Sequence, residues 1–153
     1  MKITQAIRIR AIATEGSNVG TYRQDLYRNA FKRIKQATDQ GFNLEAITLI
    51  ESLISDRLES RLSFLLKEDF SFKTLGVLIN KAKRIENNEE LKLVITSDLN
   101  KWRNQRNSAL HEMIKIQEGE TPSWEDRISN LKNVSESGLK LLRKIDLLCR
   151  KSP

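Results

Sequence analysis

The chain has 153 residues, of which 39% are hydrophobic and 31% are charged. A chain of this length forms one domain that buries roughly 70% of the surface its unfolded form exposes. The composition excludes intrinsic disorder. Two prolines and six glycines are too few for a sandwich or barrel built from many tight turns, so an all-α fold is expected.

Lys and Arg outnumber Asp and Glu by 27 to 20, which gives a formal net charge of +7. Residues 1–40 hold eight basic and three acidic side chains, a net +5. This excess favours a polyanion as partner, although it also fits a simple role in solubility.

The cysteine and histidine content narrows the class of protein further. Cys149 and His111 are the single cysteine and the single histidine, so neither an intramolecular disulfide nor a structural zinc site is expected. This fits a cytoplasmic protein without metal or other cofactor. No run of 18 apolar residues and no signal-peptide pattern is present, so no membrane association is expected.

Residues 1–20 are expected to form an N-terminal arm or short extra element, and residues 21–153 a single helical domain. In the first segment Ile7 and Ile9 alternate with Arg8 and Arg10. This pattern fits a short strand, an arm or a frayed helix.

The first helix is predicted over residues 21–40, with Gly41 as its stop. Arg28, Lys32 and Lys35 recur at helical spacing and form a basic ridge, either a phosphate contact or merely solvated surface. The apolar stripe predicted to face the core consists of Tyr22, Leu26, Ala30, Ile34 and Ala37.

A second helix is predicted to begin at Asn43 as its cap. Leu49 and Leu53 form a second apolar face, as expected for the central member of a bundle. Glu51 and Arg61 fall near the edge of the main stripe, where they are interpreted as structural ion pairs or boundary residues, with a cleft position as the alternative. That stripe follows the helical period through Ile47, Ile50, Ile54, Leu58, Leu62 and Leu65.

Three further helices are predicted, over residues 74–85, over residues 89–116 and after Pro122. Asn87 and Asn88 provide a cap for the middle one, and Thr121 or Ser123 for the last one. The expected fold is a four- to five-helix antiparallel bundle. The inward face of the last helix is predicted to carry Ile128, Leu131, Leu142, Ile145 and Leu148.

The segment 102–111 contains the one group of residues suited to chemistry. Arg103, Asn107 and His111 recur every fourth residue, so they lie on one helix face. Arg106 lies about 140° from His111 around the helix axis. The opposite, apolar face of this helix is predicted to consist of Trp102, Ala109 and Met113.

These residue types suit a phosphodiester substrate. An imidazole can move a proton near neutral pH, and a guanidinium can bind phosphate oxygens with two hydrogen bonds. The amide of Asn107 can orient the imidazole or bind a ribose hydroxyl. The simpler interpretation is an ordinary surface histidine, with arginines that complement the helix dipole.

The run from Arg106 to His111 resembles the signature of the HEPN superfamily (higher eukaryotes and prokaryotes nucleotide-binding). In that signature an arginine, usually followed by a polar residue, precedes a histidine by four to six intervening residues; here four intervene, and Asn107 is the polar one. Met113 stands where one branch of toxins, paired with nucleotidyltransferase antitoxins, carries a tyrosine.

The resemblance implies an HEPN-like bundle, a homodimer and metal-independent RNA cleavage in toxin–antitoxin or antiviral defence, with a possible antitoxin or defence partner protein. Arg106, Asn107 and His111 are then the catalytic residues. RNA contacts are expected from Arg103 and from the basic ridge of Arg28, Lys32 and Lys35. The alternatives are a catalytically inactive helical adaptor that binds RNA or protein, and a purely structural bundle.

Overall fold

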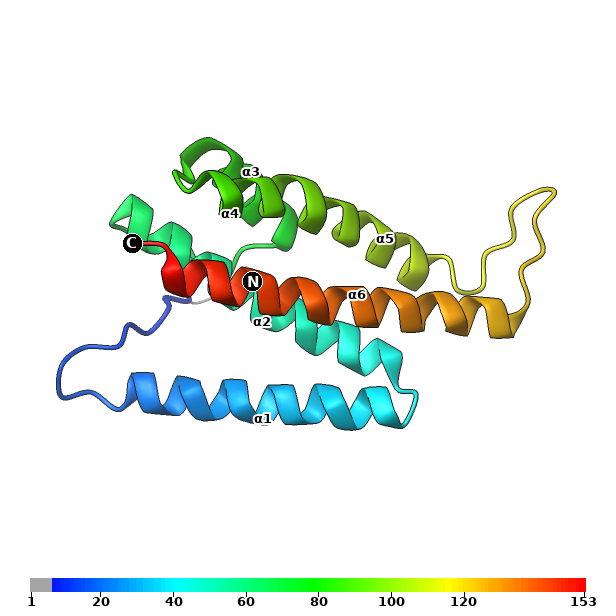
Figure 1. The fold of residues 1–153 in the computed structure, drawn as a ribbon, viewed down its shortest axis with the longest axis horizontal. Helices are drawn as coiled ribbons and strands as arrows, with labels where there is room; N and C mark the ends of the chain where they lie inside the picture. The colour runs from blue at the N-terminus through cyan, green and yellow to red at the C-terminus, as the bar shows by residue number, and fades with distance from the viewer. Residues whose placement is uncertain (1–6) are drawn as a thin grey trace, which may run out of the picture.

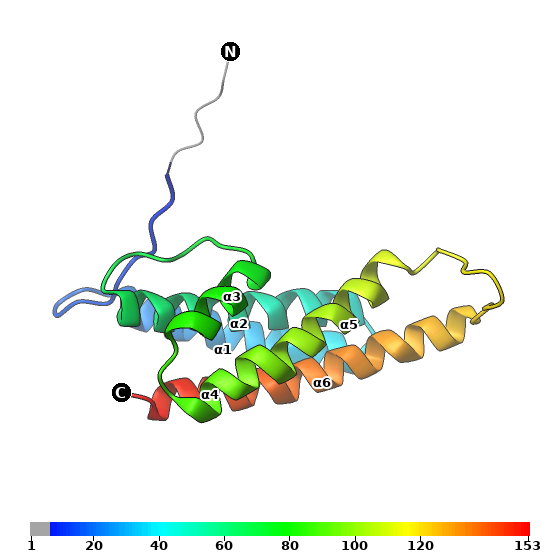
Figure 2. The same ribbon diagram turned by 90° about the horizontal axis from the view of Figure 1, so that it is seen from above.

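The computed structural model describes residues 7–153. Every secondary-structure element assigned in these residues is a helix. The three elements over residues 89–111 follow one another without a break, so the described chain has five helical stretches (Figures 1 and 2). This confirms the predicted all-α bundle. The elements are α1 (Val19–Asp39), α2 (Asn43–Leu66), α3 (Leu75–Ile85), α4 (Glu89–Leu93), the π-helix η1 (Val94–Leu99), α5 (Asn100–His111) and α6 (Trp124–Lys151).

Helix α2 is the central member of the bundle, as predicted. α1 packs on one side of it, while α6 and α3 pack on other sides, and α5 lies along α6 (Figure 1). Leu53 on its second face is buried as well. The main stripe of α2 is confirmed by complete burial of Ile47, Ile50, Ile54, Leu58 and Leu62.

Several helix ends follow the predicted local chemistry. The Asn88 side chain accepts a hydrogen bond from the backbone N–H of Leu91 at 2.9 Å, which caps α4. Ser123 and Asp126 form a reciprocal capping box at the start of α6. Gly41, with a φ of +78°, follows the end of α1 in the left-handed conformation that glycine adopts without strain.

The predicted stripe of α1 is wrong in its first half. Tyr22 and Leu26 are 65% and 51% exposed, while Tyr27 and Phe31 turn inward instead. Steps of four residues drift by about 40° each, so Tyr22 lies about 120° from the fully buried Ile34. A face that includes Tyr27 and Phe31 stays in line with the contact to α2.

The prediction of one regular helix over residues 89–116 is also wrong in two respects. Helical structure ends at His111, and residues Val94–Leu99 form a π-helix. Each π turn takes up one extra residue, which rotates everything downstream by about 100° relative to a regular helix. The direction in which α5 presents its side chains is therefore set by this irregular segment.

Two smaller predictions need correction. Phe42, not Asn43, occupies the cap position of α2, and Asn43 is buried in the first turn without a capping hydrogen bond from its side chain. Ile128 is 36% exposed, because it lies near the free start of α6. The other four residues of the predicted α6 face are buried.

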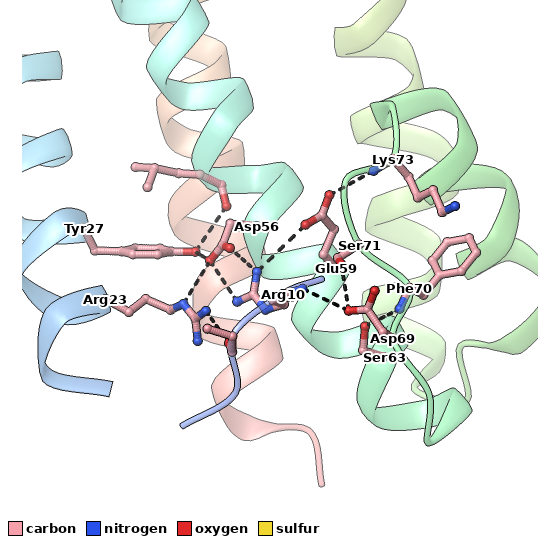
Figure 3. A network of polar contacts seen from close by, with 12 residues as sticks. Arg10, Arg23, Tyr27, Asp56, Glu59, Ser63, Asp69, Phe70, Ser71 and Lys73 are labelled. Carbon is pink, nitrogen blue, oxygen red and sulfur yellow. Dashed lines mark hydrogen bonds and ion pairs between the residues drawn. The ribbon is translucent and has the colours of Figure 1, made fainter. Parts of the chain in front are cut away.

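Residues 7–18 form an extended arm that is held against α1 and α2 by arginines (Figure 3). The guanidinium of Arg10 donates to both carboxylate oxygens of Asp56. Tyr27 donates to the same carboxylate at 2.5 Å, and Arg23 donates to the carbonyl of Ala11 at 2.8 Å. The rest of the predicted N-terminal element, residues 1–6, lies outside the described residues.

Candidate functional site

Helix α5 carries the run from Arg106 to His111, which we call the motif. Trp102 anchors the first turn of α5 to α6. The indole is 3% exposed and donates from Nε1 to the carbonyl oxygen of Val134 at 2.9 Å. A Cβ atom at Gly138 would lie only 2.7 Å from the indole ring. The absence of a side chain at Gly138 therefore lets α5 and α6 approach closely.

Arg103 lies at the contact between α5 and α3. Its guanidinium lies over Gly76 in the first turn of α3, where an added Cβ would come within 2.8 Å of Nη2. Among residues 7–153 no carboxylate lies within ion-pair distance of Arg103. Its positive charge is thus uncompensated by a direct partner in the part of the chain that the structure describes.

Arg106 points toward α2, where it forms an ion pair with Glu51. Nη2 lies 2.5 Å from Oε1 of Glu51, and the two side chains are 13% and 28% exposed. The Nε–H of Arg106 is buried without an acceptor in residues 7–153. Glu51 and Arg61, which the sequence placed near the stripe edge, are both ion-paired, Arg61 with Glu86.

His111 is the last residue of α5, and its side chain is exposed. Asn107 lies one turn earlier on the same face and is half-buried. The structure thus brings Asn107 and His111 together, whereas Arg106 points about 140° away around the helix axis. One chain does not bring guanidinium and imidazole to the same point.

Arg127 from α6 holds the turn that follows His111. Its guanidinium donates to the carbonyl oxygens of Glu112 at 2.5 Å and Lys115 at 2.8 Å. These bonds satisfy the carbonyl of the residue that caps the carboxyl end of α5 and one carbonyl of the loop that follows. Sequence reasoning missed Arg127 and did not connect Glu51 with Arg106. The sequence signal for Glu51 was the position of its carboxylate at the edge of the apolar stripe of α2. No sequence signal pointed to Arg127.

The predicted basic ridge lies far from the motif in the fold. Arg28, Lys32 and Lys35 are exposed on α1, and Arg28 is ion-paired with Asp25 at 2.9 Å. α1 packs on α2, whereas α5 packs against α6 and α3 (Figure 1). The ridge and the motif therefore lie on helices that have no extensive contact with each other.

Two hollows of the described surface are lined by residues other than Arg106, Asn107 and His111. One, of about 710 Å³, lies between the arm and the end of α2, with Ile12 and Phe64 in its walls. A smaller one of about 280 Å³ lies beside the end of α5, against Ala109 and Met113. His111 faces open surface, which suits an extended polymer better than a small enclosed ligand.

The described residues offer neither a cluster of metal ligands nor a reactive thiol. Within residues 7–153 no three His, Cys, Asp or Glu side chains gather in a way that could hold a metal ion. Burial raises the pKa of the Cys149 thiol to about 11, so at neutral pH it is protonated and a poor nucleophile. In the same residues no helix has the length and apolar composition needed to cross a bilayer.

Comparisons with protein-family models, with curated proteins and with solved structures found no match to this chain.

Proposed function

We propose that the protein is a metal-independent endoribonuclease of the HEPN type, of the kind found in toxin–antitoxin and antiviral systems. It acts as a homodimer in the cytoplasm, with Arg106, Asn107 and His111 as catalytic residues. A partner protein that restrains the activity is part of this proposal.

The observation that carries the proposal is the exposed His111 at the end of α5, with the half-buried Asn107 one turn before it and Arg106 one residue earlier still. An accessible imidazole next to an amide can take a proton from a ribose hydroxyl or give one to a leaving group. The basic character of the chain, at +7, supports a polyanionic substrate.

A dimer resolves two chemical difficulties. Attack of a 2′-hydroxyl on phosphate needs a base for the nucleophile and an acid for the 5′-oxygen, whereas each chain has one histidine. Arg106 and His111 of one chain also point in different directions around α5. Two motifs that meet across a twofold axis supply two imidazoles, and a guanidinium for the charge of the pentacoordinate phosphorus.

Incubation of purified protein with single-stranded RNA, with and without a chelator, tests the proposal. Cleavage is expected to survive chelation, to leave a 2′,3′-cyclic phosphate and a 5′-hydroxyl, and to fall by about 10²- to 10⁴-fold in His111→Ala. Arg106→Ala is expected to have a similar effect. A sizing measurement on each variant checks the dimer. Cleavage that persists in His111→Ala would refute the proposal.

One observation favours a second candidate, a helical adaptor that binds RNA or protein without cutting it. Arg106 is ion-paired with Glu51 and only 13% exposed, as a purely structural arginine would be. Salt-dependent RNA binding without cleavage would support the adaptor.

A further inference from the structure

From the contact between α2 and α5, we infer that Glu51 is a positioning residue that fixes the Arg106 guanidinium for the scissile phosphate. This inference rests on the proposed function and deepens it. It makes α2, and not only the motif helix, part of the site.

The ion pair is the only described contact that holds the charged end of Arg106 within residues 7–153. Nη2 of Arg106 lies 2.5 Å from Oε1 of Glu51, and no other hydrogen bond or ion pair joins the guanidinium to that part of the chain. An arginine side chain otherwise has many accessible rotamers. Glu51 therefore determines where this guanidinium lies.

In the described chain, one polar group of the guanidinium is left without a hydrogen bond in this position. Its Nε–H is buried and has no acceptor within residues 7–153, and an unsatisfied buried donor of this kind is unfavourable. An arginine free to move would turn outward and hydrate this group. The attraction of the Glu51 carboxylate opposes that movement and keeps Arg106 only 13% exposed.

The engaged geometry leaves the guanidinium able to act. Only Nη2 is committed to Glu51, and an arginine carries five N–H donors. A guanidinium held at one edge loses less conformational entropy when its other donors bind a phosphate oxygen. Glu51 itself is 28% exposed and acts through Arg106 and not on the RNA.

Kinetics of RNA cleavage test the inference. Glu51→Ala is expected to lower kcat by about 10- to 100-fold, because misplacement of a catalytic group by about 1 Å costs up to about 10²-fold. KM is expected to stay within about threefold, because the other RNA contacts remain. Glu51→Gln, which keeps an oxygen acceptor for Nη2, is expected to restore part of kcat.

A matched control lies on the same helix. Glu45 forms an exposed ion pair with Arg33 at 2.6 Å, on the side of α2 toward α1. Glu45→Ala removes the same side chain and one ion pair, and is expected to leave kcat unchanged. Unfolding midpoints of both variants show whether either change reduces activity merely by unfolding the chain.

A double-mutant cycle separates positioning from an independent effect. If Glu51 acts through Arg106, then Glu51→Ala has no further effect on kcat in an Arg106→Ala background. Effects that multiply in the double variant would overturn the inference. An unchanged kcat in Glu51→Ala would overturn it equally.

An NMR measurement keeps the inference testable even if the protein cleaves no RNA. The Nε–H signal of Arg106, assigned by its loss in Arg106→Lys, is expected to be protected from solvent exchange in the wild type. Protection is expected to disappear in Glu51→Ala and to persist in Glu45→Ala. Lack of protection in the wild type would overturn the positioning contact. Glu51-dependent protection without RNA cleavage would support the contact and refute the proposed function.

Discussion

The central helix α2 takes part in several Arg–Glu ion pairs, and two of them, Arg61–Glu86 and Arg106–Glu51, differ in how completely their polar atoms are satisfied. Arg61 donates to both carboxylate oxygens of Glu86, at 2.7 and 3.0 Å, and the side chains are 5% and 0% exposed. Glu86 also accepts from the backbone N–H groups of Asn87 and Asn88. Arg106 and Glu51 share one contact, are 13% and 28% exposed, and leave Nε without an acceptor.

This difference separates a structural pair from a functional candidate. A fully satisfied, buried pair ties α2 to the connection between α3 and α4, and any change to it leaves a buried charge. A singly bonded, partly exposed pair retains free donors and can accept another ligand. Unsatisfied polar groups in an otherwise well-satisfied fold are the places where function is expected.

The largest expected effect comes from breaking the buried pair. Glu86→Ala leaves Arg61 buried and unpaired, so it is expected to lower the free energy of unfolding by about 3–5 kcal/mol. Glu51→Ala is expected to lower it by less than about 1 kcal/mol, because that pair is partly exposed. Urea denaturation of both variants measures the contrast. Equal losses would remove the distinction between the two pairs.

A smaller effect is expected from Gly138→Ala, at the close approach of α6 to α5. An ordinary glycine-to-alanine change inside a helix stabilises it by up to about 1 kcal/mol. Here the new Cβ would meet the buried indole of Trp102 at 2.7 Å, and a loss of about 1–3 kcal/mol is expected. The Trp102 indole N–H resonance should shift too. Exposed Glu136 on the same helix, changed to Ala, is the control, and stabilisation by Gly138→Ala would contradict the prediction.

The mildest perturbation is acidification. Burial would raise the pKa of Glu86, but Arg61 and backbone N–H groups outweigh it and hold that pKa below its ordinary 4.5. Arg10 and Tyr27 likewise outweigh burial and hold the pKa of Asp56 below 3.8. A lowered pKa stabilises the folded state above the ordinary value, and this stability is lost as the pH falls through the folded value.

Unfolding midpoints are therefore expected to stay level from about pH 7 to 5 and to fall below about pH 4. Glu59, whose pKa is raised by burial, works in the opposite direction. Glu86→Gln removes one titrating group and is expected to flatten the acid side of the profile. A midpoint that falls as steeply in Glu86→Gln as in the wild type would show that Glu86 does not contribute.

Local patterns predicted most of the helices and several of their ends. The stripe of α2 and the caps at Asn88 and Ser123 depend on residues within one or two turns of each other, so they can be read directly along the chain. The same applies to the spacing of Arg106 and His111 on one helix. Their catalytic use stays a prediction.

Packing between helices settled what local patterns left open. Tyr27 turns inward in place of Leu26 and donates a hydrogen bond to Asp56 of another helix. The π-helix sets the rotation of α5, and the partner of Arg106 lies 55 residues earlier in the chain. Such contacts depend on how separate helices rotate and approach one another, and residue spacing within a single helix does not encode that geometry.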